Sequence, residues 1–85
     1  MNVLWSSKFK RNYKKLPEPI RKKFQKQLTL LLDNVKHPSL RVKKMESRED
    51  VWEARVDKFY RFTFQKEEEN LILRTVGPHD EALRS

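Results

Sequence analysis

Hydrophobic residues recur along the chain with two different spacings, and the change between them predicts the architecture. Up to about residue 40 they lie three and four positions apart, as on one face of a helix, and afterwards they alternate, as on a strand. The opening run NVLW, residues 2–5, is short and apolar and predicts a first strand. Ser6 or Ser7 after it can cap a helix, because a serine hydroxyl accepts a hydrogen bond from a free amide of the first turn.

Two amphipathic helices are predicted before residue 40. The sequence LPEP, residues 16–19, separates them, because each proline removes an amide donor and disfavours helical geometry in the residue before it. Pro19 suits the first turn of the second helix, and NVKHPS, residues 34–39, ends that helix. The expected buried stripes are Phe9, Tyr13 and Leu16 in the first helix, and Ile20, Phe24, Leu28, Leu31 and Val35 in the second. Lysine and arginine fill the other faces, so we expect a helix hairpin with one apolar side and one cationic side.

Four strands are predicted in the second half of the chain. LRVKKME (40–46) alternates loosely, VWEARV (51–56) and YRFTF (60–64) alternate cleanly, and LILRTV (71–76) is an apolar run typical of a central strand. KEEEN (66–70) is expected to be a solvated turn in which Asn70 tolerates left-handed geometry. The strands are therefore expected to form an antiparallel meander.

The register of one hairpin follows from the alternation of its side chains. A two-residue turn after VWEARV would mix apolar and polar residues on each face. A three-residue loop, residues 57–59, instead places Arg55 opposite Arg61 and Glu53 opposite Thr63. The predicted polar face thus carries two opposed arginines, although like charges directly across a strand pair repel each other.

These elements predict a single α+β domain spanning residues 1–85. An N-terminal strand and a two-helix hairpin would pack on one face of a four- to five-stranded, largely antiparallel sheet. A chain of 85 residues buries enough surface for one modest core. Trp5, Trp52 and the phenylalanines are expected to belong to that core.

Composition narrows the kinds of function that the chain can have. It has no cysteine and two histidines far apart, which disfavours a metal site, and it has no apolar run long enough for export or a membrane span. We therefore expect a cytoplasmic protein without a metal, a cofactor or a membrane partner. Residues 1–48 hold 14 Lys and Arg against 3 Asp and Glu, whereas residues 49–85 hold 6 against 9. This basic half favours nucleic acid or an acidic protein as the partner, and charge alone does not choose between them.

The order of these features resembles the RelE/ParE superfamily of bacterial toxins. The features are an opening strand that ends in tryptophan, a lysine-rich helix hairpin, VWEARVDKFYRFTFQ, and a closing LILRTVGPHDEAL. The resemblance covers essentially the whole chain and implies a RelE-like fold and a toxin of a toxin–antitoxin pair. It implies one of two activities, because RelE-type members cleave mRNA in the ribosomal A site without a metal and ParE-type members poison DNA gyrase.

The resemblance also implies roles for individual residues. Arg61 matches the family arginine that contacts the scissile phosphate in RelE-like ribonucleases, and Arg55 matches a basic position on the preceding strand. His79 falls where members carry an arginine or histidine that acts in proton transfer. Glu53 stands where RelE itself has lysine, although YoeB-like members use a carboxylate near that strand. Leu83 stands near the position of a catalytic tyrosine in many members, so this chain departs from the family there.

These residue types suit RNA cleavage without a metal, which needs a base, an acid and cations around the phosphorus. Arginine forks match phosphate oxygens, and a histidine exchanges protons near neutral pH. The catalytic candidates are therefore Arg61, Arg55, His79 and Glu53, with Glu53 as a proton-transfer or orienting group. The alternative is an ordinary solvated face in which Arg61 pairs with Glu53, Arg55 pairs with Asp57 or Glu81, and His79 is a surface residue.

A second group of basic residues is a candidate for binding RNA. The RNA-binding candidates come from RVKK (41–44) and are Arg41, Lys43 and Lys44, of which Lys43 and Lys44 are the better ones because they lie next to the sheet that would hold the site. The lysines of residues 8–26 could track an RNA backbone or form only a solvated helix face.

Together with these residues, the resemblance implies a metal-independent, ribosome-dependent mRNA endoribonuclease that inhibits translation and that a small acidic antitoxin would bind. The alternatives are a ParE-like gyrase inhibitor and a catalytically inactive family member that only binds an antitoxin.

Overall fold

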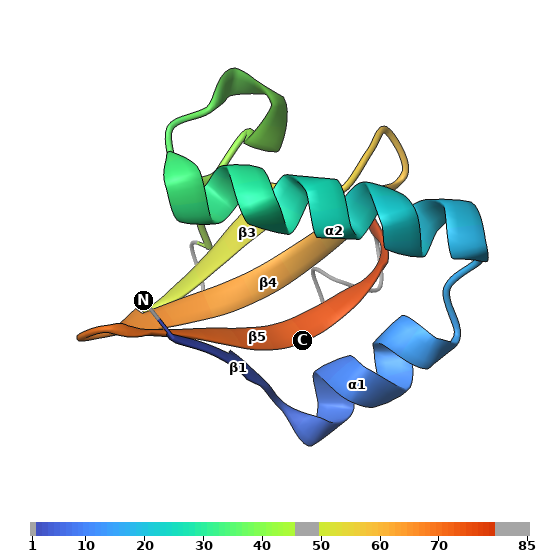
Figure 1. Ribbon diagram of the computed structural model, residues 1–85, viewed down its shortest axis with the longest axis horizontal. Coiled ribbons are helices and arrows are strands. Elements are labelled where there is room, and N and C mark those ends of the chain that lie inside the picture. The colour runs from blue at the N-terminus through green and yellow to red at the C-terminus, as the bar shows by residue number, and fades with distance from the viewer. Residues whose placement is uncertain (1, 46–49, 80–85) are drawn as a thin grey trace.

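The computed structural model describes residues 2–45 and 50–79, in which two helices pack on a five-stranded mixed sheet (Figure 1). The elements in chain order are β1 (Asn2–Trp5), α1 (Ser7–Lys14), α2 (Glu18–Asp33), the 3₁₀ turn η1 (Pro38–Leu40), β2 (Lys43–Lys44), β3 (Val51–Arg55), β4 (Tyr60–Glu67) and β5 (Asn70–Pro78). The α+β class and the order of helices and strands predicted from the sequence are confirmed.

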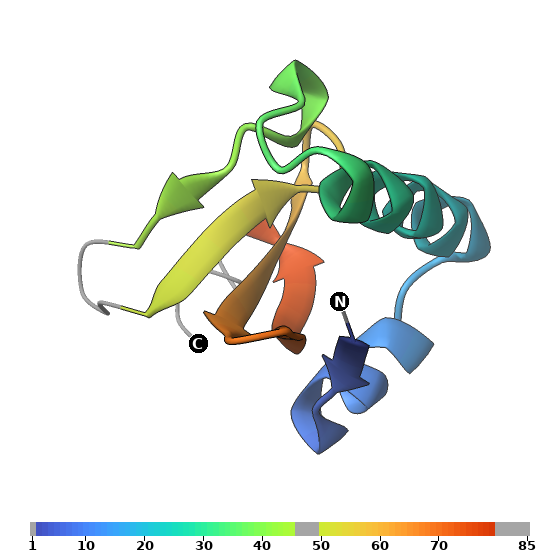
Figure 2. The same cartoon turned by 60° about the vertical axis from the view of Figure 1, so that its left-hand side comes forward.

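The sheet has the strand order β1-β5-β4-β3-β2. Strands β2 to β5 form the expected antiparallel meander, and β1 pairs in parallel with β5, with Val3 opposite Leu71. The last strand therefore lies inside the sheet beside the first (Figure 2). The prediction that LILRTV forms a central strand is confirmed, and along it buried residues alternate with half-buried ones up to Thr75.

The turn between β4 and β5 differs from the sequence prediction. Asn70 is already paired with Glu67 in the sheet, and Glu68 takes the left-handed conformation with φ of 53°. The prediction of left-handed geometry at Asn70 is wrong, because the ladder extends further toward the turn than the hydrophobic pattern does.

Ser6, one of the two predicted caps, starts α1. Its hydroxyl accepts a hydrogen bond from the Phe9 amide at 3.0 Å and donates one to the Arg74 carbonyl at 3.1 Å. The cap therefore also ties the β1–α1 junction to β5. Helix α2 begins with Pro19 in its first turn, as predicted, and ends at Asp33, so Val35 packs against the core from beyond the helix.

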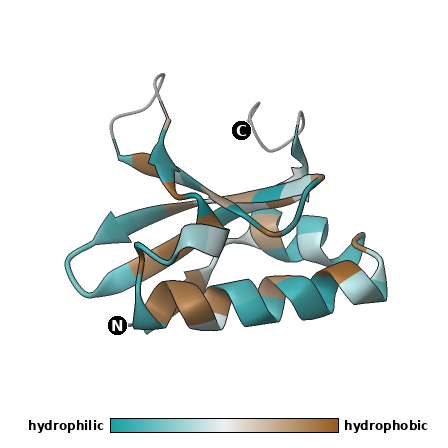
Figure 3. Ribbon diagram, turned by 90° about the horizontal axis from the view of Figure 1, so that it is seen from above, coloured by the Kyte–Doolittle hydropathy of each residue, from teal (hydrophilic) through white to brown (hydrophobic). Residues whose placement is uncertain are grey.

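An aromatic cluster joins both helices to the sheet. The Phe24 ring lies at its centre, 5.7 Å from Trp5, 5.3 Å from Phe9 and 5.0 Å from Phe62, measured between ring centroids. Figure 3 shows α2 beneath the sheet, with hydrophobic and hydrophilic positions mixed along the helix and the strands. One core prediction is wrong: Phe59 is 68% exposed, because it lies in the β3–β4 loop where strand alternation has ended. None of the helices in residues 2–45 and 50–79 is long and apolar enough to cross a membrane.

Candidate functional site

The polar face of the sheet lies opposite the helices and has the register expected from the sequence. Arg55 pairs with Arg61 and Glu53 with Thr63 across β3 and β4. Residues 56–59 connect the two strands, and the Val56 amide donates to the Tyr60 carbonyl at 3.0 Å, as a three-residue loop after Val56 requires. The alternate residues of both strands, such as Ala54 and Phe62, belong to the core. We use "polar face" for the sheet surface that carries Glu53, Arg55, Arg61, Thr63 and Thr75, the last two joined by a hydrogen bond of 2.6 Å between their hydroxyls.

The two arginines are held together by one backbone carbonyl. Arg55 Nε donates to the Asp57 carbonyl at 3.1 Å, and Arg61 Nη1 donates to the same oxygen at 2.6 Å. Arg61 Nη1 also donates to the Tyr60 carbonyl at 3.0 Å. A shared acceptor offsets part of the repulsion between the cations and fixes where their side chains point.

The ion pairs expected for an ordinary solvated face form only in part. Arg61 Nε lies 4.0 Å from Glu53 Oε1, which is a long ion pair. The carboxylate of Asp57 pairs with Lys23 at 3.3 Å, and Arg55 contacts only the backbone of that residue. Glu81, the other partner considered for Arg55, lies outside the described residues.

Glu53 is a buried carboxylate between two cations. Its side chain is 3% exposed, and Oε1 lies 3.8 Å from Lys43 Nζ and 4.0 Å from Arg61 Nε. Within residues 2–45 and 50–79, Oε2 has no hydrogen-bond partner. Glu53 therefore lies between Lys43 and Arg61 and retains one oxygen that, within the described residues, is free to accept a hydrogen bond.

The β3–β4 loop that carries the shared carbonyl is organised by Asp57. Its carboxylate accepts hydrogen bonds from the amides of Phe59 at 2.8 Å and Tyr60 at 2.9 Å, and it pairs with Lys23. Burial by itself would raise the pKa of this carboxyl, but the two amides and Lys23 outweigh it, so the pKa lies below its ordinary value. Asp57 is thus an ionised structural group that fixes the loop.

His79 follows the end of β5 next to this loop. Gly77 pairs with Arg61 and Pro78 with Tyr60, and the His79 amide donates to the Phe59 carbonyl at 2.8 Å. The histidine therefore lies two residues beyond Gly77, the residue opposite Arg61. Its Nδ1 is buried and has no hydrogen-bond partner in the part of the chain that the structure describes. Leu83, where the family tyrosine is expected, lies outside the described residues.

The three RNA-binding candidates occupy different positions. Lys43 pairs with Glu53 in the sheet and extends the polar face, whereas Lys44 pairs with Trp52, whose side chain packs against the core from the helix side. Arg41 ends η1 in the left-handed conformation with φ of 46° and is exposed. The fold therefore groups Lys43 with the arginines and places Lys44 on the opposite side of the sheet.

Sequence reasoning missed Arg74. A register shift between Thr63 and Phe64 changes which residues of β5 face the polar side, and Arg74 Nη1 donates to Gln65 Oε1 at 2.5 Å there. Its Nε is buried with no partner among the described residues. The only sequence signal was a charge inside the apolar run LILRTV, because the irregularity that orients it is a property of strand pairing.

Within residues 2–45 and 50–79, no group of three or more His, Cys, Asp or Glu side chains is arranged to hold a metal ion. The polar face carries two fixed guanidinium groups and a buried carboxylate, and the imidazole of His79 follows the end of β5 next to the β3–β4 loop. Such a set can bind a phosphate and move protons around it.

Comparison with known proteins connects this geometry to a family. No curated protein sequence gives a significant match to the chain. The solved structures similar to it include the RelB–RelE antitoxin–toxin complex from Methanococcus jannaschii, with 20% identity, a TM-score of 0.76 and 93% of each chain covered. YafQ from Escherichia coli strain BL21(DE3) has 15% identity and a TM-score of 0.79, with 94% of each chain covered. The archaeal RelE–RelB complex from Pyrococcus horikoshii OT3 has 19% identity and a TM-score of 0.75, and the match covers 95% of this chain and 97% of that one.

At these identities the solved structures show a shared fold, and the sequence comparison shows the family. The family model for the ParE toxin of the parDE type II toxin–antitoxin system matches residues 3–83. This match spans nearly the whole chain, including β3, β4 and the arginine pair. The chain therefore belongs to the ParE toxin family of type II toxin–antitoxin systems and is a toxin of the RelE/ParE superfamily.

Proposed function

We propose that this toxin is a metal-independent endoribonuclease that cleaves mRNA in the ribosomal A site and so inhibits translation. The observation that carries the proposal is the opposed pair Arg55 and Arg61, which meets at one end of the polar face, where the end of β5 brings the backbone of His79 beside the β3–β4 loop. Guanidinium groups on two neighbouring strands can donate hydrogen bonds to the oxygens of one phosphodiester. A bound anion would also relieve the repulsion between the two cations.

The proposed reaction is an internal transfer within the RNA. The 2′-oxygen attacks the adjacent phosphorus, the bond from phosphorus to the 5′-oxygen breaks, and the products are a 2′,3′-cyclic phosphate and a 5′-hydroxyl. A base removes the proton of the 2′-hydroxyl and an acid gives one to the leaving oxygen, so no water or other reactant is consumed. Negative charge increases on the phosphate oxygens in the transition state, where fixed cations stabilise it most.

The side chains have distinct proposed roles in this reaction. Arg55 and Arg61 hold the scissile phosphate, and their shared acceptor, the Asp57 carbonyl, orients them before the substrate arrives. His79 acts as acid or base, since imidazole exchanges protons near neutral pH. Glu53 orients Arg61 or acts as the second proton-transfer group through its unpartnered oxygen.

The test is to map transcript 5′ ends minutes after the toxin is induced in bacteria. Wild type is expected to produce new 5′-hydroxyl ends inside translated regions, and Arg61→Ala is expected to reduce them at least tenfold. Arg11→Ala is the matched control, because Arg11 is an exposed arginine of α1, and it should cut like wild type. Cuts confined to translated regions would support the ribosome as the site of action.

Gyrase inhibition is the second candidate, because the matching family is described by the ParE toxin. In that case the polar face would be a binding surface without chemistry. Growth arrest with intact transcripts would overturn the ribonuclease proposal, and loss of supercoiling by purified gyrase in the presence of the toxin would then support gyrase inhibition. A catalytically inactive member would affect neither transcripts nor gyrase.

We further propose that a cognate antitoxin covers the basic surface of this chain. The Methanococcus and Pyrococcus relatives are seen in complexes with RelB. The formal charge of +8 favours an acidic partner, whose association would slow as salt screens the attraction.

A further inference from the structure

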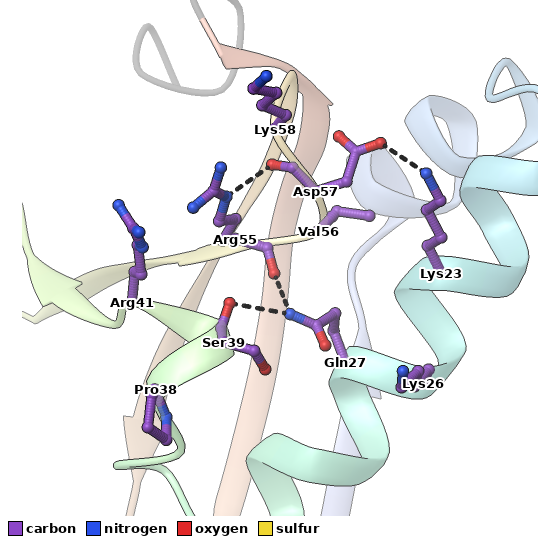
Figure 4. A pocket seen from close by; sticks show the side chains of 10 residues that line it. All are labelled: Lys23, Lys26, Gln27, Pro38, Ser39, Arg41, Arg55, Val56, Asp57 and Lys58. Atoms are coloured by element: carbon purple, nitrogen blue, oxygen red, sulfur yellow. Dashed lines mark hydrogen bonds and ion pairs between the residues drawn. The ribbon is translucent and has the colours of Figure 1, made fainter.

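A cationic hollow lies beside the arginine pair, between α2, η1 and the β3–β4 loop (Figure 4). It is open, has a volume of about 530 Å³, and is lined by side chains from all three segments. Its cations are Lys23, Lys26, Arg41, Arg55 and Lys58, and they face a single carboxylate, that of Asp57. These residues are spread over 36 positions of the sequence, so their grouping is a product of the fold.

Most of this charge is not neutralised by neighbouring side chains. The Asp57 carboxylate pairs with Lys23 at 3.3 Å and accepts the loop amides of Phe59 and Tyr60. Among the described residues, Lys26, Arg41 and Lys58 have no carboxylate within ion-pair distance. Gathering unpaired cations around one hollow costs electrostatic free energy that a bound anion would recover.

The wall of the hollow is fixed by a buried polar side chain. Gln27 is 7% exposed, and its Nε2 donates to the Ser39 carbonyl at 3.2 Å and to the Arg55 carbonyl at 2.8 Å. Figure 4 shows this amide between the η1 segment and β3. The cations therefore come from three segments that are joined by hydrogen bonds. Because these segments are already fixed, a ligand loses less binding free energy to the ordering of the protein.

We infer that this hollow binds the phosphates next to the scissile one on a single RNA strand, an inference that rests on the proposed ribonuclease function. Arg55 belongs both to the arginine pair and to the lining of the hollow. A strand whose scissile phosphate lies between Arg55 and Arg61 would have further cations next to Arg55 for its neighbouring phosphates.

The lining favours a nucleic-acid backbone over a protein segment. Among its ten residues only Pro38 and Val56 are apolar, and none is aromatic. Protein partners are usually anchored by apolar and aromatic side chains in a dry centre, whereas nucleic-acid backbones are held mainly by lysine and arginine.

The test measures RNA binding separately from cleavage. The probe is a fluorescent single-stranded RNA with 2′-O-methyl sugars, which lacks the attacking hydroxyl and stays intact. Its dissociation constant is measured by anisotropy at several salt concentrations for the full chain and for the triple variant Lys26→Gln, Arg41→Gln, Lys58→Gln. The matched control is Lys10→Gln, Arg11→Gln, Lys14→Gln, which removes the same charge from exposed positions of α1.

The hollow variant is expected to bind the RNA at least tenfold more weakly than the control at low salt. The slope of log affinity against log salt should fall by about 2, since each lost phosphate contact on a single strand contributes about 0.7. Equal losses in the two variants would overturn the inference, because the effect would then be one of net charge. Unchanged RNA binding combined with lost binding of an acidic antitoxin would also overturn it and would identify the hollow as a protein surface.

The two proposals fail in distinguishable ways. If transcript mapping finds no cleavage while the hollow variant still loses affinity for the 2′-O-methyl RNA, the ribonuclease proposal fails and the anion site remains. The altered side chains are exposed, and melting curves of both variants that match wild type show that the comparison is made between folded proteins.

Discussion

Asp57 shows how one residue supports the candidate site without belonging to its chemistry. Its carboxylate closes the β3–β4 loop through two amides, and its carbonyl receives both arginines. The same residue thus fixes the loop and orients the cations. We therefore expect substitutions of this side chain to lower the stability of the protein, and to lower its activity only through the position of the loop and the arginines.

Asp57→Ala should destabilise the protein by about 1–2 kcal/mol at pH 7, because two loop amides lose their acceptor. Asp57→Asn keeps an oxygen for these amides and should cost less. The measurement is urea unfolding followed by circular dichroism. A loss in Asp57→Asn as large as that in Asp57→Ala would show that charge, and not the amide acceptor, carries the effect.

At acid pH, wild type should lose the extra stability that the Asp57 carboxylate gives it over the Asp57→Asn variant. The folded pKa of Asp57 lies below its unfolded value of about 3.9, so the carboxylate stabilises the folded state above that pH. This contribution is lost as the pH falls through the folded pKa. The difference in unfolding free energy between wild type and Asp57→Asn should therefore shrink between pH 7 and about pH 2, and a constant difference would contradict this account.

At the scale of elements, the buried amide of Gln27 joins a helix to two separate segments. It donates to carbonyls of Ser39 in η1 and Arg55 in β3, while the aromatic cluster holds the other half of α2. Sequence reasoning did not single out Gln27, although it lies between Phe24 and Leu28 of the predicted buried stripe. Only the packed position of η1 gives this amide two acceptors.

Gln27→Leu should destabilise the protein by about 1–3 kcal/mol, because the hydrogen bonds to two backbone carbonyls are lost. Gln25→Leu is the control, because Gln25 is an exposed residue of the same helix and bonds the Tyr13 hydroxyl at the surface. It should change the free energy of unfolding by about 0.5 kcal/mol or less. Thermal or urea unfolding compares the two, and equal effects would argue against a special role for Gln27.

At the scale of the whole molecule, a single core holds both layers together. Phe24 contacts aromatic rings from β1, α1 and β4, so its removal affects every layer at once. Phe59, by contrast, packs against little of the protein.

Phe24→Ala should cost about 3–5 kcal/mol, which is a large part of the stability of a domain of this size. Phe59→Ala, the same change at an exposed position, should stay within about 0.5 kcal/mol of wild type. Differential scanning calorimetry of both variants is the measurement. A comparable loss in Phe59→Ala would mean that the loop packs more tightly in solution than its exposure indicates.

The sequence alone determined the elements and their order, the register of the β3–β4 hairpin and the opposed arginines. These features depend on local rules: the period of hydrophobic residues, the effect of proline on helices, and the parity of side chains on paired strands. The same rules brought Glu53, Arg55 and Arg61 to one face.

The tertiary structure decided what depends on contacts between distant segments. Three such features cannot be seen in the spacing of residues along the sequence. They are the parallel pairing of β1 with β5, the orientation of Arg74 by the irregular register, and the grouping of Lys23, Arg41 and Lys58. The positions of such residues are set by the packing of whole elements against one another, because the free energy that fixes them comes from the shared core.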